Sequence, residues 1–226
     1  MSAILPHEIK EIPQPFVVVC EGYGDIRFID ALLQFKNIAN CSVGCPSERG
    51  GFGTGKEAIP PYLKGIQTAI LRKKANLQGI LVIADADENP ADSFNLMVQA
   101  LQSASFPPPA APFSIEGNPI RVGIFLMPGA GRNGCLEHIL WDAAVKKTPA
   151  IEKCVADFST CTGGHILAAS GNQQAKMKMS ALVAAFCKDN PWASPGLMWS
   201  DAGNPVPINS VCFETLGAFL TKFTTP

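Results

Sequence analysis

Four short apolar runs in the first part of the chain have the length of β-strands. They are FVVVC at 16–20, CSVGC at 41–45, GILVIA at 79–84 and RVGIFLM at 121–127. Runs of this length that end at turn residues are typical of strands buried in a sheet. The unbroken apolar character of GILVIA is typical of a parallel strand, because helices cover such strands on both faces.

The segments between these runs have apolar residues at three- and four-residue steps, which is the spacing of one helix face. This spacing occurs in residues 25–35, 57–75 and 92–104. In the first segment, for example, Ile26, Ile29 and Leu33 would share one stripe. Strands that alternate with helices predict an α/β fold, in which helices sandwich a mostly parallel sheet.

The last part of the chain has mainly helical spacing and follows a proline-rich loop at 106–119. Helices are predicted in residues 135–147, 150–160, 174–189 and 210–223, with a long irregular connection at 189–207. We therefore expect an α/β domain at 1–147 and a helical C-terminal extension at 148–226 that packs on the same core.

The charge of the chain limits how it could bind nucleic acid. Its formal net charge is −1, from 18 basic and 19 acidic residues, and only 16% of its residues are charged. Proteins that coat nucleic acid by bulk charge are strongly basic. Any contact with nucleic acid would therefore be local and assisted by a metal ion.

The sequence also favours a cytoplasmic protein without a membrane partner. Its first residues do not show the basic and apolar regions of a secretory signal. No apolar run approaches the roughly 18 to 20 residues that span a membrane. The eight cysteines include no CxxC pair, and Cys20 and Cys187 lie in apolar surroundings, which fits reduced thiols. Only three histidines are present, all far apart, so a zinc site is not expected.

Acidic residues follow two of the apolar runs. Glu21 comes directly after the first run, and Asp85 and Asp87 lie just past the third. Ligands of open α/β sheets bind beyond the carboxyl ends of the strands, and residues two apart in an extended segment point the same way. Carboxylates that converge repel one another unless a cation neutralises them, and Mg²⁺ and Mn²⁺ prefer oxygen ligands. The pattern therefore predicts a metal site.

A second interpretation of these acids stays open. Asp and Asn commonly cap the helix that follows a strand. Asp25 would cap the helix over 25–35 in that case, and Asp87 or Asn89 would cap the helix over 92–104.

The order of these motifs resembles the Toprim domain, which occurs in topoisomerases, bacterial primases, recombination-mediator proteins and OLD-family nucleases. In that domain a strand ending in Glu-Gly precedes a strand ending in Asp-x-Asp, which matches Glu21 and the pair Asp85 and Asp87. The spacing EGYGD is similar to the form found in OLD-like Toprim proteins, which would bring Asp25 into the site. The whole order of motifs over residues 16 to about 145 is similar to small stand-alone bacterial Toprim proteins of poorly defined function.

The resemblance implies metal-dependent phosphodiester chemistry, with Glu21, Asp85 and Asp87 as the catalytic set. Asp85 and Asp87 would bind Mg²⁺ or Mn²⁺, and Glu21 would act as general acid and base or bind a second metal. Asp25 would complete the ligands, and so would Glu137, which matches a glutamate of the small group. A plain helix-terminus charge is the other interpretation of Glu137.

The expected function is therefore a Mg²⁺-dependent nuclease or related phosphotransferase that acts on nucleic acid, with a possible protein partner. The alternative is a non-catalytic module that binds metal, nucleotide or protein in a defence or repair complex.

The glycine-rich stretch GGFGTGK at 50–56 invites comparison with a P-loop. Glu57, however, stands where a P-loop needs the Ser or Thr hydroxyl that binds Mg²⁺. A turn whose Lys56, together with Arg49, contacts a phosphate is the better interpretation. The other interpretation is that Lys56 and Arg49 are exposed loop charges.

Two further basic positions are candidates for phosphate binding. Arg132 lies in the glycine-rich turn PGAGRNG, and Lys178 lies beside Lys176 in QAKMKM. OLD-like nucleases use a lysine near the metals, and the resemblance implies this role for one of the two lysines. The alternative for Arg132 is an exposed turn, and the alternative for the two lysines is an exposed helix face.

Overall fold

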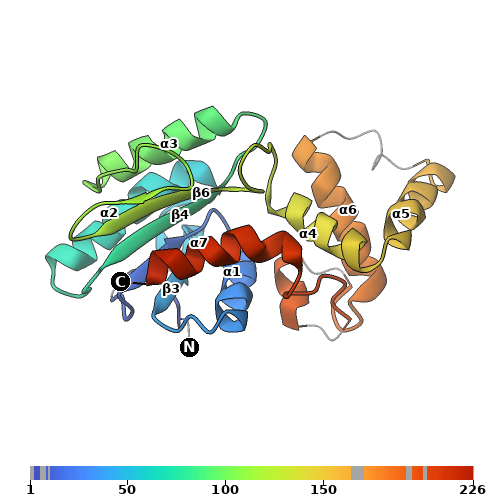
Figure 1. Cartoon of the computed structure of the whole chain (residues 1–226), viewed down its shortest axis with the longest axis horizontal. Helices are drawn as coiled ribbons and strands as arrows, with labels where there is room; N and C mark the ends of the chain where they lie inside the picture. Colours follow the sequence, from blue (N-terminus) through green and yellow to red (C-terminus); the bar gives the residue numbers. More distant parts are fainter. Residues whose placement is uncertain are drawn as a thin grey trace.

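The computed structural model of the chain describes residues 3–5, 9, 11–163, 171–191, 195–200 and 203–225. A sheet lies between layers of helices, and a further group of helices extends from one end of it (Figure 1). The strands are β1 (Ala3–Ile4), β2 (Phe16–Val19), β3 (Cys41–Gly44), β4 (Gly79–Asp85), β5 (Ile115–Glu116) and β6 (Arg121–Met127). The α-helices are α1 (Tyr23–Phe35), α2 (Ile59–Leu71), α3 (Pro90–Ser103), α4 (Leu136–Lys147), α5 (Ala150–Cys161), α6 (Gly171–Phe186) and α7 (Glu214–Thr224). The 3₁₀-helices are η1 (Glu48–Gly50), η2 (Lys56–Ala58), η3 (Pro195–Ser200) and η4 (Val211–Phe213).

The described strands form one sheet in the order β1-β3-β2-β4-β6-β5. All neighbours in it are parallel except β5, which pairs antiparallel with β6. The four apolar runs correspond to β2, β3, β4 and β6, and the predicted helices correspond to α1 through α7. The predicted α/β class, with a mostly parallel sheet and a C-terminal helix, is confirmed.

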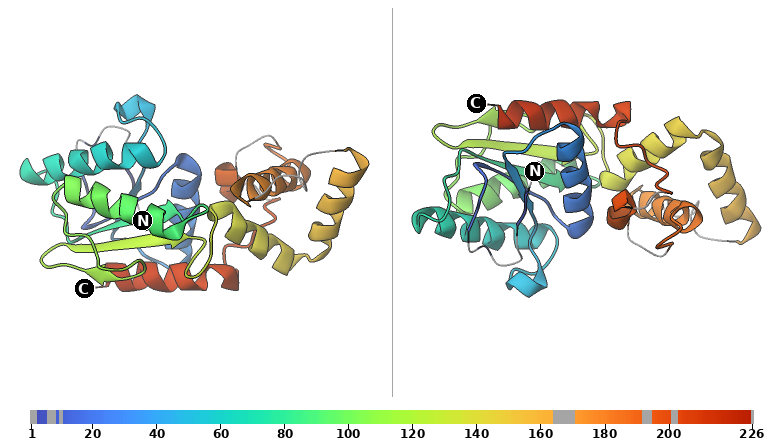
Figure 2. Two further views of the ribbon diagram at one scale, coloured as in Figure 1. Left: turned by 90° about the horizontal axis from the view of Figure 1, so that it is seen from above. Right: turned by 90° about the horizontal axis from the view of Figure 1, so that it is seen from below.

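The connections divide the helices between the two faces of the sheet. From β2 the chain moves outward to β3, whereas from β4 it moves in the opposite direction to β6. Because parallel crossovers are right-handed, α1 covers one face while α2 and α3 cover the other. Figure 2 shows the sheet with α2 and α3 on one side and α7 on the other. The strand order therefore reverses between β2 and β4, and ligands of α/β sheets bind at such a switch point.

The side chains of β2 alternate between two apolar cores. Val17 and Val19 pack with α2 and α3, whereas Phe16 and Val18 pack with α1 and α7. The last helix, α7, packs on the same face of the sheet as α1 and covers the part that α1 leaves open. The ring of its Phe223 lies 5.3 Å from that of Phe16, measured between centroids. The final helix of the predicted C-terminal extension is therefore a layer of the sandwich itself.

Helices α4, α5 and α6 lie beyond the carboxyl edge of the sheet (Figure 1). They share buried apolar side chains with the core under α1 and α7, such as Leu140 of α4 and Met179 of α6. Beside them, η3 approaches α1 closely, since a Cβ on Gly196 would lie 2.5 Å from the Cα of Gly24. None of the helices in the described ranges is both long and apolar enough to cross a membrane.

Candidate functional site

A cavity of about 460 Å³ lies at the carboxyl edge of the sheet, next to the switch point. Its walls come from the segments after β2 and β3, the end of β4, and the helices α1, α4 and α6, with Gly196 of η3. Four of the predicted site residues line it, and all four carry carboxylates: Glu21, Asp25, Asp85 and Glu137. Segments far apart in the sequence thus bring acidic groups to one place.

Glu21 follows β2 and is bound to the neighbouring strand. Its Oε1 accepts a hydrogen bond from the backbone N–H of Asp85 at 2.6 Å, and its side chain is only 18% exposed. Burial raises the pKa of Glu21 to about 7, against the lowering effect of Lys56 and the Asp85 N–H, and the nearby Asp25 and Asp87 raise it further. A carboxyl group with a pKa near 7 can both take up and release a proton at neutral pH.

Asp85 is the last residue of β4 and faces the start of α4. Its Oδ1 accepts a hydrogen bond from the backbone N–H of Leu136 at 3.0 Å. Burial raises its pKa well above the usual range, and the charges of Glu21, Asp25 and Glu137 raise it further. The structure therefore holds this carboxylate where its negative charge is costly.

Asp25 lines the cavity and also stabilises the start of α1, although the N-cap residue of this helix is Gly22 and not Asp25. Its carboxylate accepts a hydrogen bond from the backbone N–H of Gly22 at 2.9 Å, at the start of α1. Burial raises its pKa to about 6, and Glu137 adds to the rise. Glu137 itself lies in the first turn of α4, as expected.

Asp87 departs from the predicted geometry. Its φ is 52°, so the segment after Asp85 is not extended, and Asp87 does not line the cavity beside Asp85. The reason is a pair of backbone hydrogen bonds with Gly134, at 2.8 and 2.7 Å, which turns the chain at this point. The Asp87 carboxylate instead accepts hydrogen bonds from Lys56 and, at 2.6 Å, from Asn172 of α6. Asn89, not Asp87, caps α3, because its side chain accepts hydrogen bonds from Ala91 and Asp92.

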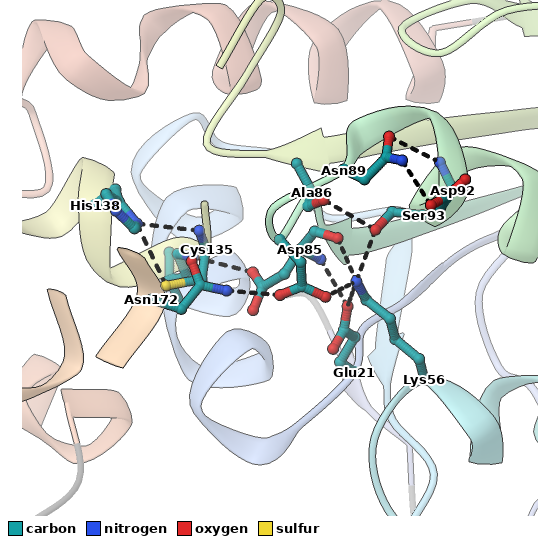
Figure 3. A network of polar contacts seen from close by, with 12 residues as sticks. Glu21, Lys56, Asp85, Ala86, Asn89, Asp92, Ser93, Cys135, His138 and Asn172 are labelled. Carbon is teal, nitrogen blue, oxygen red and sulfur yellow. Dashed lines mark hydrogen bonds and ion pairs between the residues drawn. The ribbon is translucent and has the colours of Figure 1, made fainter. Parts of the chain in front are cut away.

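Lys56 reaches in among these acids from the glycine-rich loop (Figure 3). Its ammonium donates to the carbonyl of Asp85 at 2.6 Å, to Oγ of Ser93 at 3.0 Å and to the Asp87 carboxylate, and it lies 3.7 Å from Glu21. Its side chain is only 11% exposed. The loop is therefore not an open phosphate cradle, and Lys56 serves first as a counter-ion to the acids.

None of the four predicted basic residues lines the cavity, and three of them also lie away from its acids. Arg132 pairs with Asp142 at 2.8 Å, and the ammonium of Lys178 lies 5.1 Å from the ring centroid of Trp141. Arg49 is exposed on η1. The lysine of α6 that lines the cavity is Lys176.

The acids around Lys176 raise its pKa. Burial lowers its pKa, but Glu137, with Cys135 and the other carboxylates, raises the pKa by more, and the net change is upward. Lys176 therefore stays protonated and places a positive charge in the cavity wall.

Sequence reasoning did not find Ser93 and Asn172, which hold Lys56 and Asp87. Both are neutral residues on helices, and no local motif marks them.

The donor chemistry of the cavity fits Mg²⁺ or Mn²⁺, because four carboxylates line it. The side chains are nevertheless not arranged as a ready ligand set. Among the described residues, no three His, Cys, Asp or Glu side chains together form a group that could hold a metal ion. Lys56 lies between Glu21 and Asp87 and supplies a positive charge there.

Comparison with known proteins gives a family for the chain. Residues 15–196 match a family model described as "Protein of unknown function (DUF3226)". The chain belongs to this family. No curated protein and no solved structure matches.

The DUF3226 match contains the whole cavity. It begins just before β2 and ends at Gly196, so every residue that lines the cavity lies inside it. Helix α7 lies outside it.

The raised pKa values of the cavity carboxylates predict how stability depends on pH. Between the usual carboxyl pKa and about 7, the folded state holds the Glu21 proton more tightly than the unfolded chain does. Stability must then fall as the pH rises through this window. For Glu21 alone the loss is on the order of 3 kcal/mol.

The measurement is the melting temperature in EDTA at several pH values between 4.5 and 8, a range that covers this window, for wild type and Glu21→Gln. We expect a clear fall for wild type and a smaller one for the variant. His138, whose pKa burial lowers, affects stability mainly at lower pH and is common to both proteins. Equal slopes would show that Glu21 does not titrate in this way.

Proposed function

We propose that this DUF3226 chain is a Mg²⁺- or Mn²⁺-dependent nuclease, or a related phosphotransferase, that acts on nucleic acid at the carboxylate cavity. One observation carries the proposal. Glu21, Asp25, Asp85 and Glu137, from three separate segments, meet in one cavity at the switch point of the sheet. Burial, together with their mutual repulsion, raises the pKa of Asp85, and such costly clusters are typical of functional sites.

The residues divide into two roles in this proposal. Asp85, Glu137 and Asp25 would hold the ion after their side chains move together, since they form no ready ligand set in the described structure. Asp87 would join them once Lys56 releases it. When bound, the ion supplies positive charge to the phosphate oxygens. Glu21 would move protons, because its pKa lies near 7.

Lys176 would contact the phosphate of the substrate, since it is the cavity lysine of α6. The likeness of Glu21, Asp85 and Asp87 to the Toprim motif supports the same chemistry. A cytoplasmic location and a protein partner also belong to the proposal. The partner would help to hold nucleic acid, because a net charge of −1 does not favour binding by bulk charge.

The test is an incubation of the pure protein with labelled single- and double-stranded DNA and RNA, in Mg²⁺, Mn²⁺ or EDTA. We expect cleavage of at least one substrate with a divalent cation and none in EDTA. Asp85→Asn, purified in the same way, controls for contaminating nucleases. Absence of cleavage with every substrate and cation would overturn the proposal.

A non-catalytic binding module is the second candidate, and the position of Lys56 favours it. The Lys56 ammonium already contacts Asp87, the Asp85 carbonyl and Ser93. A site that neutralises its acids internally could bind a nucleotide or a protein without using a metal.

Replacement of Lys56 by Met separates the two candidates. If Lys56 competes with a metal for the acids, Lys56→Met should bind Mg²⁺ about tenfold more tightly, because one competing charge is gone. The metal-free variant should lose about 2 kcal/mol of stability, since hydrogen bonds from a charged group are lost.

The measurement is the rise in melting temperature with Mg²⁺, compared among wild type, Lys56→Met and Lys153→Met. Lys153 is an exposed lysine paired with Asp157, so its replacement should change little. If only Lys56→Met responds to Mg²⁺ and wild type does not, the binding module is the better account.

A further inference from the structure

The cavity has an aromatic side chain at its mouth. Tyr23, the first residue of α1, lines the cavity and is 44% exposed. Among the large apolar side chains that are exposed in the described structure, Tyr23 alone also lines the cavity. An aromatic ring left in water beside a group of carboxylates contributes little to folding, and its position suits contact with a ligand.

A cation is fixed next to this ring. The guanidinium of Arg27, one turn along α1, lies 4.9 Å from the ring centroid of Tyr23. Its Nε also donates a hydrogen bond to the Tyr23 hydroxyl at 2.9 Å. With Lys176 in the cavity wall, the entrance has a ring and two positive charges around an acidic interior.

We propose that the cavity takes an unpaired nucleotide of single-stranded DNA or RNA, whose base stacks on Tyr23 while flanking phosphates contact Arg27 and Lys176. This inference rests on the proposed function and names its substrate class. An aromatic ring binds the face of a base, and only an unpaired base offers that face, because duplex bases are stacked on one another. The cavity volume of about 460 Å³ falls within the range of small-ligand sites, so one nucleotide can enter it and a duplex cannot.

The acidic interior sets a condition on this binding. Carboxylates and phosphates repel one another, so the strand should bind well only when a divalent cation is present. Binding is therefore measured in Ca²⁺, which is offered in place of Mg²⁺ so that the strand is not consumed during the measurement.

The experiment measures fluorescence polarisation of labelled 12-nucleotide single strands of DNA and of RNA, and of a DNA duplex of the same length. The proteins are wild type, Tyr23→Ala, Tyr23→Phe and Phe35→Ala. Phe35 is the matched control, because it lies on the same helix and is 43% exposed, but it does not line the cavity.

Tyr23→Ala should weaken single-strand binding about 5- to 150-fold, the range for loss of one stacked base. Tyr23→Phe keeps the ring and should bind much more tightly than Tyr23→Ala, and Phe35→Ala should match wild type. Preference for either DNA or RNA agrees with the proposal. It is overturned if Tyr23→Ala binds as Phe35→Ala does, or if wild type binds the duplex as tightly as the single strand.

The same data separate this inference from the proposed function. If wild type binds single strands through Tyr23 but cleaves nothing in Mg²⁺ or Mn²⁺, the stacking site stands and the nuclease proposal fails. If wild type cleaves nucleic acid and Tyr23→Ala binds normally, the nuclease proposal stands and the stacking site fails.

Discussion

Glu21→Gln should reduce metal-dependent cleavage about 10²- to 10⁴-fold, the usual contribution of general acid–base catalysis. The pKa of Glu21 is raised to about 7, so the native carboxyl can both accept and deliver a proton at neutral pH. A glutamine amide can do neither. The loss should therefore appear in turnover rather than in folding.

The variant should keep its local structure. Oε1 of Glu21 accepts a hydrogen bond from the backbone N–H of Asp85 at 2.6 Å, and the amide oxygen of glutamine can accept the same hydrogen bond. Metal binding should consequently stay close to that of wild type, and the metal-free variant should be at least as stable as wild type at neutral pH, because it has no carboxylate to ionise there. Glu152→Gln is the matched control, because Glu152 is exposed on α5 outside the cavity.

Undiminished cleavage by Glu21→Gln would show that Glu21 has no role in proton transfer. Equal loss of cleavage in Glu152→Gln would show that the assay reports a general effect of charge.

Asp85→Asn should make the metal-free protein more stable at pH 8 and abolish its response to Mg²⁺. The Asp85 charge is costly in the native state, because burial and the neighbouring Glu21 raise its pKa well above the usual range. Removal of that charge should therefore raise the melting temperature of the metal-free protein. Asparagine can still accept the hydrogen bond that Leu136 N–H donates at 3.0 Å.

The measurement is the melting temperature of wild type and Asp85→Asn, each in EDTA and in millimolar Mg²⁺. Wild type should gain stability with Mg²⁺ by mass action. Asp157→Asn removes an exposed ion pair on α5 and should respond to Mg²⁺ as wild type does. A destabilised Asp85→Asn protein that still responds to Mg²⁺ would contradict the role of Asp85.

The central strands of the fold could be predicted from the sequence because burial on both faces leaves an unbroken apolar run. The strands β1 and β5 contain two residues each, which is too short for any pattern. Helix α7 was predicted as a helix, but its place was not. Its apolar stripe shows that one face of the helix is buried, but the surface that buries it, the part of the sheet left open by α1, is known only from the fold.

The site could be predicted in part for a similar reason. Glu21 follows β2 and Asp85 ends β4, and these strands lie side by side, so the convergence of the two acids depends only on parallel pairing. The direction of Asp87 depends instead on backbone pairing with Gly134, which no local pattern shows. Lys176 and Lys178 are two residues apart on a helix and therefore point about 200° apart. Only the placement of α6 decides that Lys176 faces the cavity.

The central claim is that the cavity carboxylates hold a divalent cation, and a titration of Mn²⁺ followed by electron paramagnetic resonance tests it most directly. The signal of free Mn²⁺ falls as the ion binds protein, so the titration gives both affinity and stoichiometry. We predict that wild type binds Mn²⁺ and that Mg²⁺ displaces it, whereas Asp85→Asn binds at least tenfold more weakly. Wild-type protein that leaves the free Mn²⁺ signal unchanged, or Asp85→Asn that binds as wild type does, would contradict the account.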